Sequence, residues 1–393
     1  MVEALRAGCV AALCCCALGA AGEQAVPAVP PAVIPPGYHP VQARDERGLW
    51  LELEDYEKAL SRSALRVRDR TLNDYVEGLV CKVARDYCAD FRVYVMRNPS
   101  FNASMTANGM MQVWTGLLTR VGSEDELATV LGHEIAHYER AHTLAQFRKM
   151  KKDMAVGSIF DFGLLMIGVP VPAGQMTAML NVLAFSRDEE QEADLLGARL
   201  MADAGFDPHA TYQIWRDLID EDAHAEIKRE APSPFAKTHP GSEVRAQTLE
   251  SWVSATYGGA APARDQTQFK AILAANMDWL MEDQIKTGRY GRTEYLLSRQ
   301  QALGMAPGAQ HFYRAQMLQQ RGAPGDDAAA KQEYELAIAE PAAPSRAFRN
   351  LGYLLWKANE TAAARTQFAR YLEVEPSASD RAMIESYMTA EAP

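Results

Sequence analysis

Apolar residues recur with helical spacing along most of the chain, and the clearest case begins at Ser123. Ser123 and Glu126 have the spacing of a capping box, which marks the start of a helix. The apolar positions that follow fall at intervals of three and four residues, as one helix face requires: Leu127, Val130, Leu131 and Ile135. Basic residues at 148–152 are favoured at the far end of the same helix by its dipole. Gly132 lowers helix stability relative to alanine, so it indicates close packing against another element.

Two short segments have the pattern that is typical of strands, with side chains alternating between two faces. They are residues 91–96 and residues 108–114. We expect the two segments to join in a small sheet. Together with the helical patterns, they predict an α+β domain that is mostly helical.

Length and composition indicate a chain of several parts. Its 393 residues have room for two or three domains. Prolines between residues 27 and 40 indicate an extended linker at 23–45. All candidate catalytic residues fall within 46–262, which we expect to form one domain. Residues 263–393 are alanine-rich and helical in pattern, so we expect an all-α domain there.

Residues 345–378 have the spacing of a 34-residue tetratricopeptide unit. Six residues fall at the positions where paired helices interlock: Phe348, Leu351, Gly352, Ala364, Phe368 and Pro376. A weaker copy precedes this unit, around Phe312 and Tyr334. Stacked units of this kind expose a concave surface that usually holds a peptide or a partner protein. A helical array that only supports the first domain is the alternative interpretation.

The candidate chemistry lies between His133 and His137, which read His-Glu-x-x-His. On a helix, residues four apart lie on one face, so both imidazoles can reach one cation. Glu134 projects beside them, where it can hold a metal-bound water and take its proton, as in zinc hydrolases. The alternative is an ordinary charged helix with two solvated histidines.

Zinc hydrolases generally use three protein ligands, so a third ligand must come from elsewhere in the chain. The extended motif His-Glu-x-x-His-x-x-Gly-x-x-His is excluded, because Arg140 and Thr143 occupy its glycine and last histidine positions. His142 is one residue out of register, and we expect it on another side of the helix. A second helical segment, after residue 185, offers three carboxylates that chemistry alone does not separate: Glu189, Glu190 and Glu192.

Several ordered elements give the chain a resemblance to a known family. In chain order they are Asn102-Ala103 with the segment 108–118, the His-Glu-x-x-His motif, a Glu-x-x-x-Asp element at Glu190 and Asp194, and Thr238-His239-Pro240 with Arg245. These elements resemble the HtpX and CAAX-prenyl-protease group of zinc metallopeptidases, and within it the periplasmic BepA-like branch. Four elements in the right order are far more specific than any one motif.

The resemblance implies one zinc ion per chain, bound by His133, His137 and Glu190. The choice of Glu190 follows from the family pattern, in which the ligand glutamate stands four residues before an aspartate. That aspartate corresponds to Asp194, which would orient a histidine ligand through a hydrogen bond. A surface salt bridge is the alternative role for Asp194.

The resemblance also implies roles for two later residues. His239 is similar to a family histidine near the metal, which covers the open position at rest or stabilises the transition state. A loop histidine before a turn proline is the alternative. Arg245 is a candidate to bind the oxyanion, and an ion pair with Glu243 is equally compatible with the sequence.

In the family, the strand before the catalytic helix is an exposed edge beside the metal. The corresponding residues here are Asn108, Gly109, Met110 and Met111. An edge strand can pair with an extended polypeptide, so we expect these residues to bind the substrate backbone. The alternative is an edge that only packs on the catalytic helix.

The N-terminus and the net charge indicate where the protein works and which partners it excludes. Residues 1–22 contain a short apolar run behind Arg6, the plan of a secretory signal peptide that is too short to span a bilayer. We therefore expect a periplasmic protein after cleavage. The net charge of −11, without a basic tract, argues against nucleic acid as a partner.

Two further features follow from export. Cleavage would leave Cys81 and Cys88 as the remaining cysteines, and we expect a disulfide between them rather than two free thiols. The helix around residue 80 must then end near residue 86, so that Cys88 can fold back. Apolar residues 155–171 are too few to span a membrane, and they predict a buried helix between the two metal-binding helices. The alternative is a lid or a membrane-touching hairpin near the active site.

Together these features predict a zinc-dependent endopeptidase of the bacterial envelope that hydrolyses misfolded or stalled exported proteins. The resemblance implies a setting in outer-membrane protein assembly, contacted through the C-terminal repeats. The alternative is a periplasmic chaperone or assembly factor that acts through its repeats and carries a quiescent metal site. The intact Glu134, with three candidate ligands beside it, favours the endopeptidase.

Overall fold

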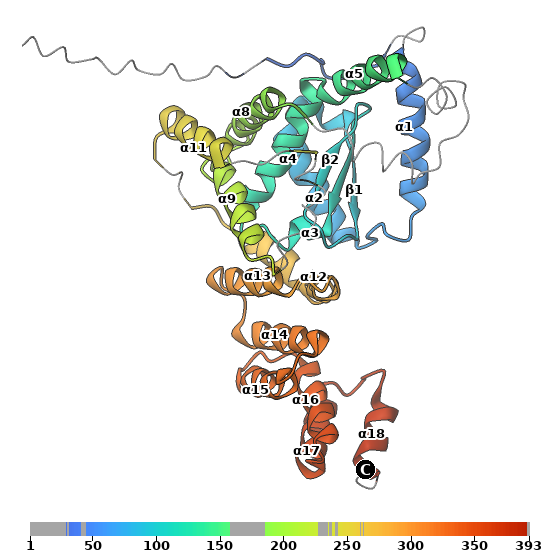
Figure 1. The fold of residues 1–393 in the computed structure, drawn as a ribbon, viewed down its shortest axis with the longest axis vertical. Coiled ribbons are helices and arrows are strands. Elements are labelled where there is room, and N and C mark those ends of the chain that lie inside the picture. The colour runs from blue at the N-terminus through green and yellow to red at the C-terminus, as the bar shows by residue number, and fades with distance from the viewer. Residues whose placement is uncertain are drawn as a thin grey trace, which may run out of the picture.

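The computed structural model of the protein describes residues 29, 31–40, 45–157, 185–226, 235, 238–239, 243–259, 261 and 263–390 (Figure 1). The predicted signal peptide and residues 158–171 of the apolar segment lie outside these ranges. None of the described helices is both long enough and apolar enough to cross a bilayer.

The first part of the chain combines helices with one small sheet. Its elements are α1 (Asp45–Arg62), α2 (Arg70–Ala84), the 3-10 helix η1 (Arg85–Asp90), β1 (Arg92–Met96), β2 (Ala103–Met105), β3 (Met110–Trp114), α3 (Thr115–Leu118), α4 (Glu124–Glu139), α5 (His142–Gly157), α8 (Arg187–Asp203), α9 (Ala210–Ala223) and α11 (Glu243–Tyr257).

The second part is entirely helical where it is described. It contains α12 (Thr267–Lys286), α13 (Tyr290–Ala302), α14 (Pro307–Arg321), α15 (Asp326–Ala339), α16 (Ser345–Lys357), α17 (Thr361–Val374) and α18 (Arg381–Thr389). The predicted fold class, a mostly helical α+β domain followed by an all-α region, is confirmed.

The sheet has the strand order β1-β3-β2. β1 runs parallel to β3, with Arg92 opposite Met110, and β2 runs antiparallel to β3, with Ala103 opposite Val113. β3 is therefore the central strand, and the expectation that Asn108–Met111 forms an exposed edge is wrong. The reason is a tight turn at residues 106–109, where Gly109 adopts φ 80° and its N–H donates to the Thr106 carbonyl at 3.0 Å. This turn folds the short segment β2 back onto β3.

The four residues proposed to bind the substrate backbone are packed inside the domain instead of lying on an open edge. Asn108, Met110 and Met111 are buried, with 3%, 0% and 0% of their surfaces exposed. Gly109 is packed so closely that a Cβ atom there would lie 2.2 Å from the Asp90 carbonyl oxygen. Asn108 and Gly109 thus belong to the turn before β3, and Met110 and Met111 to the central strand. Within the described chain, β1 and β2 are the two outer strands of the sheet, each paired with β3 alone.

The long helix predicted from Ser123 onward is present as two helices. α4 begins as expected, because the Ser123 side chain accepts a hydrogen bond from the Glu126 N–H. It ends at Glu139, and the chain then turns through Ala141, which has the left-handed φ of 57°. α5 starts immediately afterwards at His142, in a new direction.

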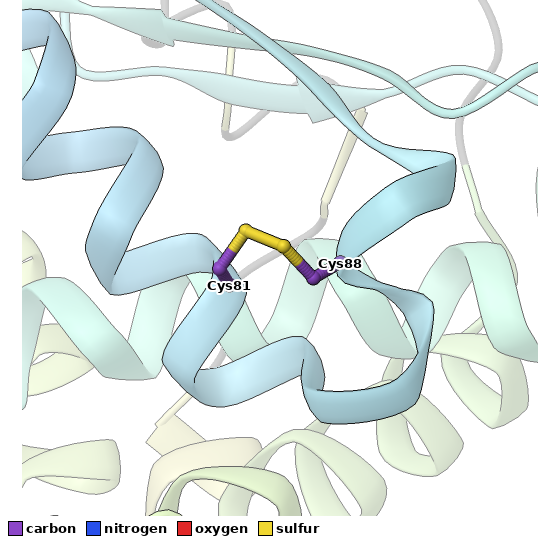
Figure 2. Close-up of a disulfide and its surroundings, with 2 residues drawn as sticks. All are labelled: Cys81 and Cys88. Carbon is purple, nitrogen blue, oxygen red and sulfur yellow. A yellow bond between two sulfur atoms is a disulfide. The ribbon is translucent and has the colours of Figure 1, made fainter.

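Cys81 and Cys88 are joined by a disulfide in the structure (Figure 2). Cys81 lies in the last turn of α2, which ends at Ala84, and Cys88 lies in η1. The change from α-helix to 3-10 helix at Arg85 turns the chain back, so that the two Cα atoms are 4.5 Å apart.

Helix α12 connects two hydrophobic cores. Four side chains in its first part belong to the core that surrounds α4: Phe269, Ile272, Leu273 and Leu280. Met281 and Ile285, near its end, belong to the core of the C-terminal helices. In Figure 1, α12 and α13 lie directly below the sheet-containing part, and α14 to α18 extend away from it.

Ion pairs reinforce this junction. Arg97, just after β1, pairs with Asp283 of α12 at 2.6 Å. Arg299 of α13 pairs with Glu126 in the first turn of α4 at 2.9 Å. The helical region is thus connected directly to the start of the helix that carries the His-Glu-x-x-His motif.

Residues 345–378, which have the spacing of a 34-residue unit, contain the helices α16 and α17. Leu351, Ala364 and Phe368 are buried between these helices. A Cβ atom on Gly352 would lie 2.5 Å from the Phe368 ring, so this position needs a residue without a side chain. α14 and α15 form a second antiparallel pair that precedes it (Figure 1).

Candidate metal centre

Three segments bring four potential metal ligands together. α4 contributes His133 and His137, one turn apart, and α8 contributes Glu190. His239 comes from the segment before α11. One ligand atom from each of the four residues lies within 4.8 Å of the others, and all four residues are buried. Of the three carboxylates that the sequence offered, Glu190 is the one that lies in this group, and its role as a metal ligand stays a prediction.

The spacing of these atoms matches a small metal site. Nε2 of His133 lies 3.1 Å from Nε2 of His137 and 3.7 Å from Glu190 Oε2. Nε2 of His137 lies 3.6 Å from Glu190 Oε1. Tetrahedral coordination with bonds near 2.0–2.1 Å places neighbouring ligand atoms about 3.3 Å apart. The two histidines and the glutamate therefore fit three corners of a zinc-sized tetrahedron.

His239 occupies the fourth corner. Its Nδ1 lies 3.3 Å from His133 Nε2 and 3.0 Å from Glu190 Oε1. Burial lowers the pKa of His133 and His137, and it lowers the pKa of His239 to about 4. Neutral imidazoles carry the lone pair that a metal ion needs.

Glu134 lies beside the cluster but is not one of its four potential ligands. Its side chain is buried, and burial raises the pKa of its carboxyl to about 7. Oε1 lies 3.5 Å from His239 Nε2, and within the described chain no group donates a hydrogen bond to it. The Met105 main-chain N–H of β2 hydrogen-bonds to the same carboxylate. An unsatisfied buried oxygen beside a ligand cluster indicates a place for a water molecule.

A buried ion pair between Asp194 and Arg245 contacts both His133 and Glu190. Asp194 Oδ1 lies 3.1 Å from His133 Nδ1, and Arg245 Nε lies 2.5 Å from Asp194 Oδ2. Burial alone would raise the pKa of Asp194, but the Arg245 charge and its hydrogen bonds hold it below the usual range. Arg245 also pairs with Glu190. Its charge is thus directed at these two carboxylates, and its use as an oxyanion ligand stays a prediction.

Aromatic rings enclose the cluster. Phe185, two residues before α8, stacks on the His137 ring with centroids 3.9 Å apart. Phe235 stacks on the His239 ring at 4.3 Å, and Trp215 of α9 stacks on Phe235 at 5.4 Å. This apolar enclosure explains why burial is the main cause of the pKa shifts of His133, His137, Glu190 and His239.

The other two glutamates of α8 have different roles. Glu189 completes the capping box of α8, since its side chain accepts from the Ser186 N–H at 2.8 Å. Glu192 accepts hydrogen bonds from Arg140 at 2.8 Å and from His142 at 3.2 Å. Neither carboxylate faces the ligand cluster.

Sequence reasoning missed several residues that border the site. His142 was expected to point away, but the turn at Ala141 brings its Nδ1 within 2.9 Å of His137 Nδ1. The missed signal was the end of α4, because a continuous helix would have kept the two rings apart. Met105 and Phe185 carry no motif, and their position depends on strand pairing and on the entry to α8.

The helix pair and its buried His-Glu-x-x-His cluster define a metallopeptidase domain. Residues 66–253, slightly less than half of the chain, match the model of peptidase family M48, so this part of the chain is similar to that family.

Three relatives show how far this similarity extends. The chain is 35% identical over 167 residues to the mitochondrial metalloendopeptidase OMA1 of Schizosaccharomyces pombe, covering 42% of this chain and 47% of that one. It is 31% identical over 159 residues to the protein of the same name from Arabidopsis thaliana, covering 40% and 31%. It is 25% identical over 201 residues to the beta-barrel assembly-enhancing protease of Escherichia coli K12, covering 48% and 40%. The chain thus spans less than half the length of the curated relatives it matches.

Proposed function

We propose that this protein is a zinc-dependent endopeptidase of the bacterial envelope, with Glu134 as its general base. The observation that carries the proposal is the position of Glu134, buried beside four potential ligands with one unsatisfied oxygen. Zinc, when bound by His133, His137 and Glu190, would polarise the scissile carbonyl and acidify a bound water.

The protein's own groups account for the remaining chemistry. Glu134 accepts the proton of the attacking water and later transfers it to the leaving amine. A pKa near 7 is well suited to both transfers at neutral pH. His239 Nδ1 lies at the fourth corner, so we infer that this arrangement is a resting state and that His239 moves to admit water.

The substrate is proposed to be an extended polypeptide. β2 is the strand next to α4, and the main chain of its residue Met105 reaches Glu134. A polypeptide that adds to this edge would be bound through its backbone, with little dependence on its side chains. Such recognition is suited to misfolded or stalled proteins of varied sequence.

The proposed setting is the periplasm, close to outer-membrane protein assembly. The similarity to a protein named beta-barrel assembly-enhancing protease supports this setting, and the Cys81–Cys88 disulfide is typical of oxidising compartments. We propose that α12–α18 are tetratricopeptide-like repeats that bind a component of the assembly machinery. The closed position of His239 also supports the second candidate, a chaperone or assembly factor whose metal site is quiescent until a client binds.

The decisive experiment compares wild type with Glu134→Gln in the full chain. Glutamine keeps the shape but cannot take a proton, so casein digestion should fall by at least ~10²–10⁴-fold while zinc content stays near one per chain. Glu124→Gln, at the start of the same helix, is the matched control and should digest casein normally. Near-normal digestion by Glu134→Gln would contradict the assignment, and a zinc-loaded wild type without any proteolysis would favour the chaperone.

A further inference from the structure

His142 contacts a metal-binding residue from outside the ligand cluster. Its Nδ1 lies 2.9 Å from Nδ1 of His137, and its Nε2 lies 3.2 Å from Oε2 of Glu192. The His142 ring is buried, with 4% of the residue exposed. The three side chains therefore form a continuous line of contacts from the cluster toward the surface.

Only one arrangement of protons is compatible with metal binding through His137 Nε2. That atom must carry the lone pair, so the ring proton of neutral His137 is on Nδ1. A short contact between two Nδ1 atoms requires one donor and one acceptor, so His142 Nδ1 is unprotonated. The proton of His142 is then on Nε2, where it faces the Glu192 carboxylate. Each contact thus sets the tautomer of the next ring.

The outer end of this line is held in place. Arg140 Nη2 lies 2.7 Å from Glu192 Oε2, and Arg140 Nη1 donates to the Pro31 carbonyl at 2.6 Å. The segment around Pro31 is itself attached to α4, because the Val33 N–H donates to the Glu139 carbonyl at 2.7 Å. Glu192 is therefore oriented by Arg140, which is itself held by the Pro31 carbonyl.

We propose that His142 is a positioning residue that presents Nε2 of His137 to the metal, with Glu192 fixing its tautomer. The two ligand histidines of α4 would then be oriented by different means. His133 Nδ1 faces the carboxylate of Asp194, whereas His137 Nδ1 faces a neutral imidazole. The inference rests on the proposed metal site, and groups in this second layer typically contribute 10–100-fold to metal affinity.

Zinc affinity of the full chain, measured by competition with a chromophoric chelator, tests the proposal. His142→Phe keeps a ring but removes the acceptor, and we expect it to weaken zinc binding by about 10–100-fold. His142→Asn returns an acceptor oxygen near the position of Nδ1 and should bind within a few-fold of wild type. The zinc affinity of Glu192→Ala should lie between those of His142→Phe and His142→Asn. Because the Glu192 side chain is partly exposed, this variant also tests the line of contacts if His142→Phe does not fold.

A spectroscopic readout separates positioning from general stability. With Co²⁺ in place of zinc, the visible absorption bands should shift in His142→Phe and return toward wild type in His142→Asn. His311→Phe is the matched control, because His311 also pairs with a glutamate, Glu333, at 2.6 Å but lies in α14. It should change neither the affinity nor the spectrum.

The outcomes distinguish this inference from the proposed function. If wild type itself binds no zinc, the metal site and the proposed function fail together. If wild type binds zinc and His142→Phe binds it equally well, the positioning role of His142 is wrong. Equal losses in His142→Phe and His142→Asn would also overturn it, because the acceptor would then be irrelevant.

Discussion

Gly132 of α4 and Gly197 of α8 lie directly against each other. A Cβ atom on Gly197 would be 2.8 Å from the His133 nitrogen, and one on Gly132 would be 3.0 Å from the Gly197 carbonyl oxygen. The backbones of the two helices therefore touch at this point. Glu190 lies two turns before Gly197 on α8, so this close approach sets the distance between Glu190 and His133.

Gly197→Ala should separate α4 from α8 and weaken the metal site. The added methyl group meets backbone atoms, which cannot rotate away, so we expect a loss of ~1–3 kcal/mol in the free energy of unfolding and lower zinc affinity. Urea unfolding and zinc titration measure the two effects. Gly78→Ala in α2 is the control, since a Cβ there meets nothing within 4 Å and should be neutral or stabilising. Unchanged zinc affinity in Gly197→Ala would contradict the role of this contact.

Glu190→Ala should remove most of the bound zinc, because two histidines are too few protein ligands for a stable site. Glu189→Ala is one residue away on the same helix and removes the capping box instead of a ligand. It should cost ~1 kcal/mol of stability and leave zinc content unchanged. Elemental analysis after dialysis measures the zinc content of both variants. Equal zinc content in Glu190→Ala and Glu189→Ala would refute the choice of Glu190 as a ligand.

Arg299→Met should destabilise the protein most strongly at alkaline pH. Arg299 pairs with both Glu126 and Asp217, and burial raises the pKa of each carboxyl. Without Arg299 these folded-state pKa values rise further above the unfolded values, so stability is lost as pH increases through them. We expect a loss of about 3–5 kcal/mol at pH 8 and a clearly smaller loss at pH 5.

Thermal unfolding at the two pH values measures the effect. Arg370→Met is the control, since Arg370 forms an exposed pair with Glu373. It should change stability by less than ~0.5 kcal/mol at either pH. A pH-independent loss in Arg299→Met would show that the two carboxylates are not the cause.

Truncation tests where the first domain ends. The boundary proposed from sequence, after residue 262, would remove four α12 side chains from the core around α4. At ~1.5–3 kcal/mol for each, this loss is comparable with the whole stability of a typical domain. We therefore expect a chain ending at 262 to be unfolded, and one ending at 304, after α13, to fold and bind zinc. Circular dichroism and zinc content check both, and a folded, zinc-binding 1–262 chain would place the boundary where the sequence put it.

The Cys81–Cys88 disulfide should stabilise the first domain modestly. Closing a loop of this length contributes roughly 2 kcal/mol in the chain-entropy account. A double variant, Cys81→Ser with Cys88→Ser, should unfold at lower urea concentration than wild type and should no longer respond to a reducing agent. If the reducing agent has no effect on wild type either, the two thiols are free in solution.

Local features of this protein followed from the sequence because they depend on neighbours within one or two turns. The start of α4 at Ser123 and the shared face of His133 and His137 are consequences of capping and of 3.6 residues per turn. The turn near residue 85 followed from the reach of a disulfide. The family pattern then added Glu190, which periodicity alone did not select.

Tertiary structure decided which segments meet. The sequence did not show that β2 pairs with β3 and makes it the central strand, because a strand of three residues has almost no periodic signal. It did not show that α4 stops at Glu139, since a left-handed φ at Ala141 is an uncommon conformation for alanine. It also did not show that the core extends into α12. Contacts between distant segments depend on the packing of the whole domain, and they bring His142, Met105 and Arg245 to a site that local spacing only partly defines.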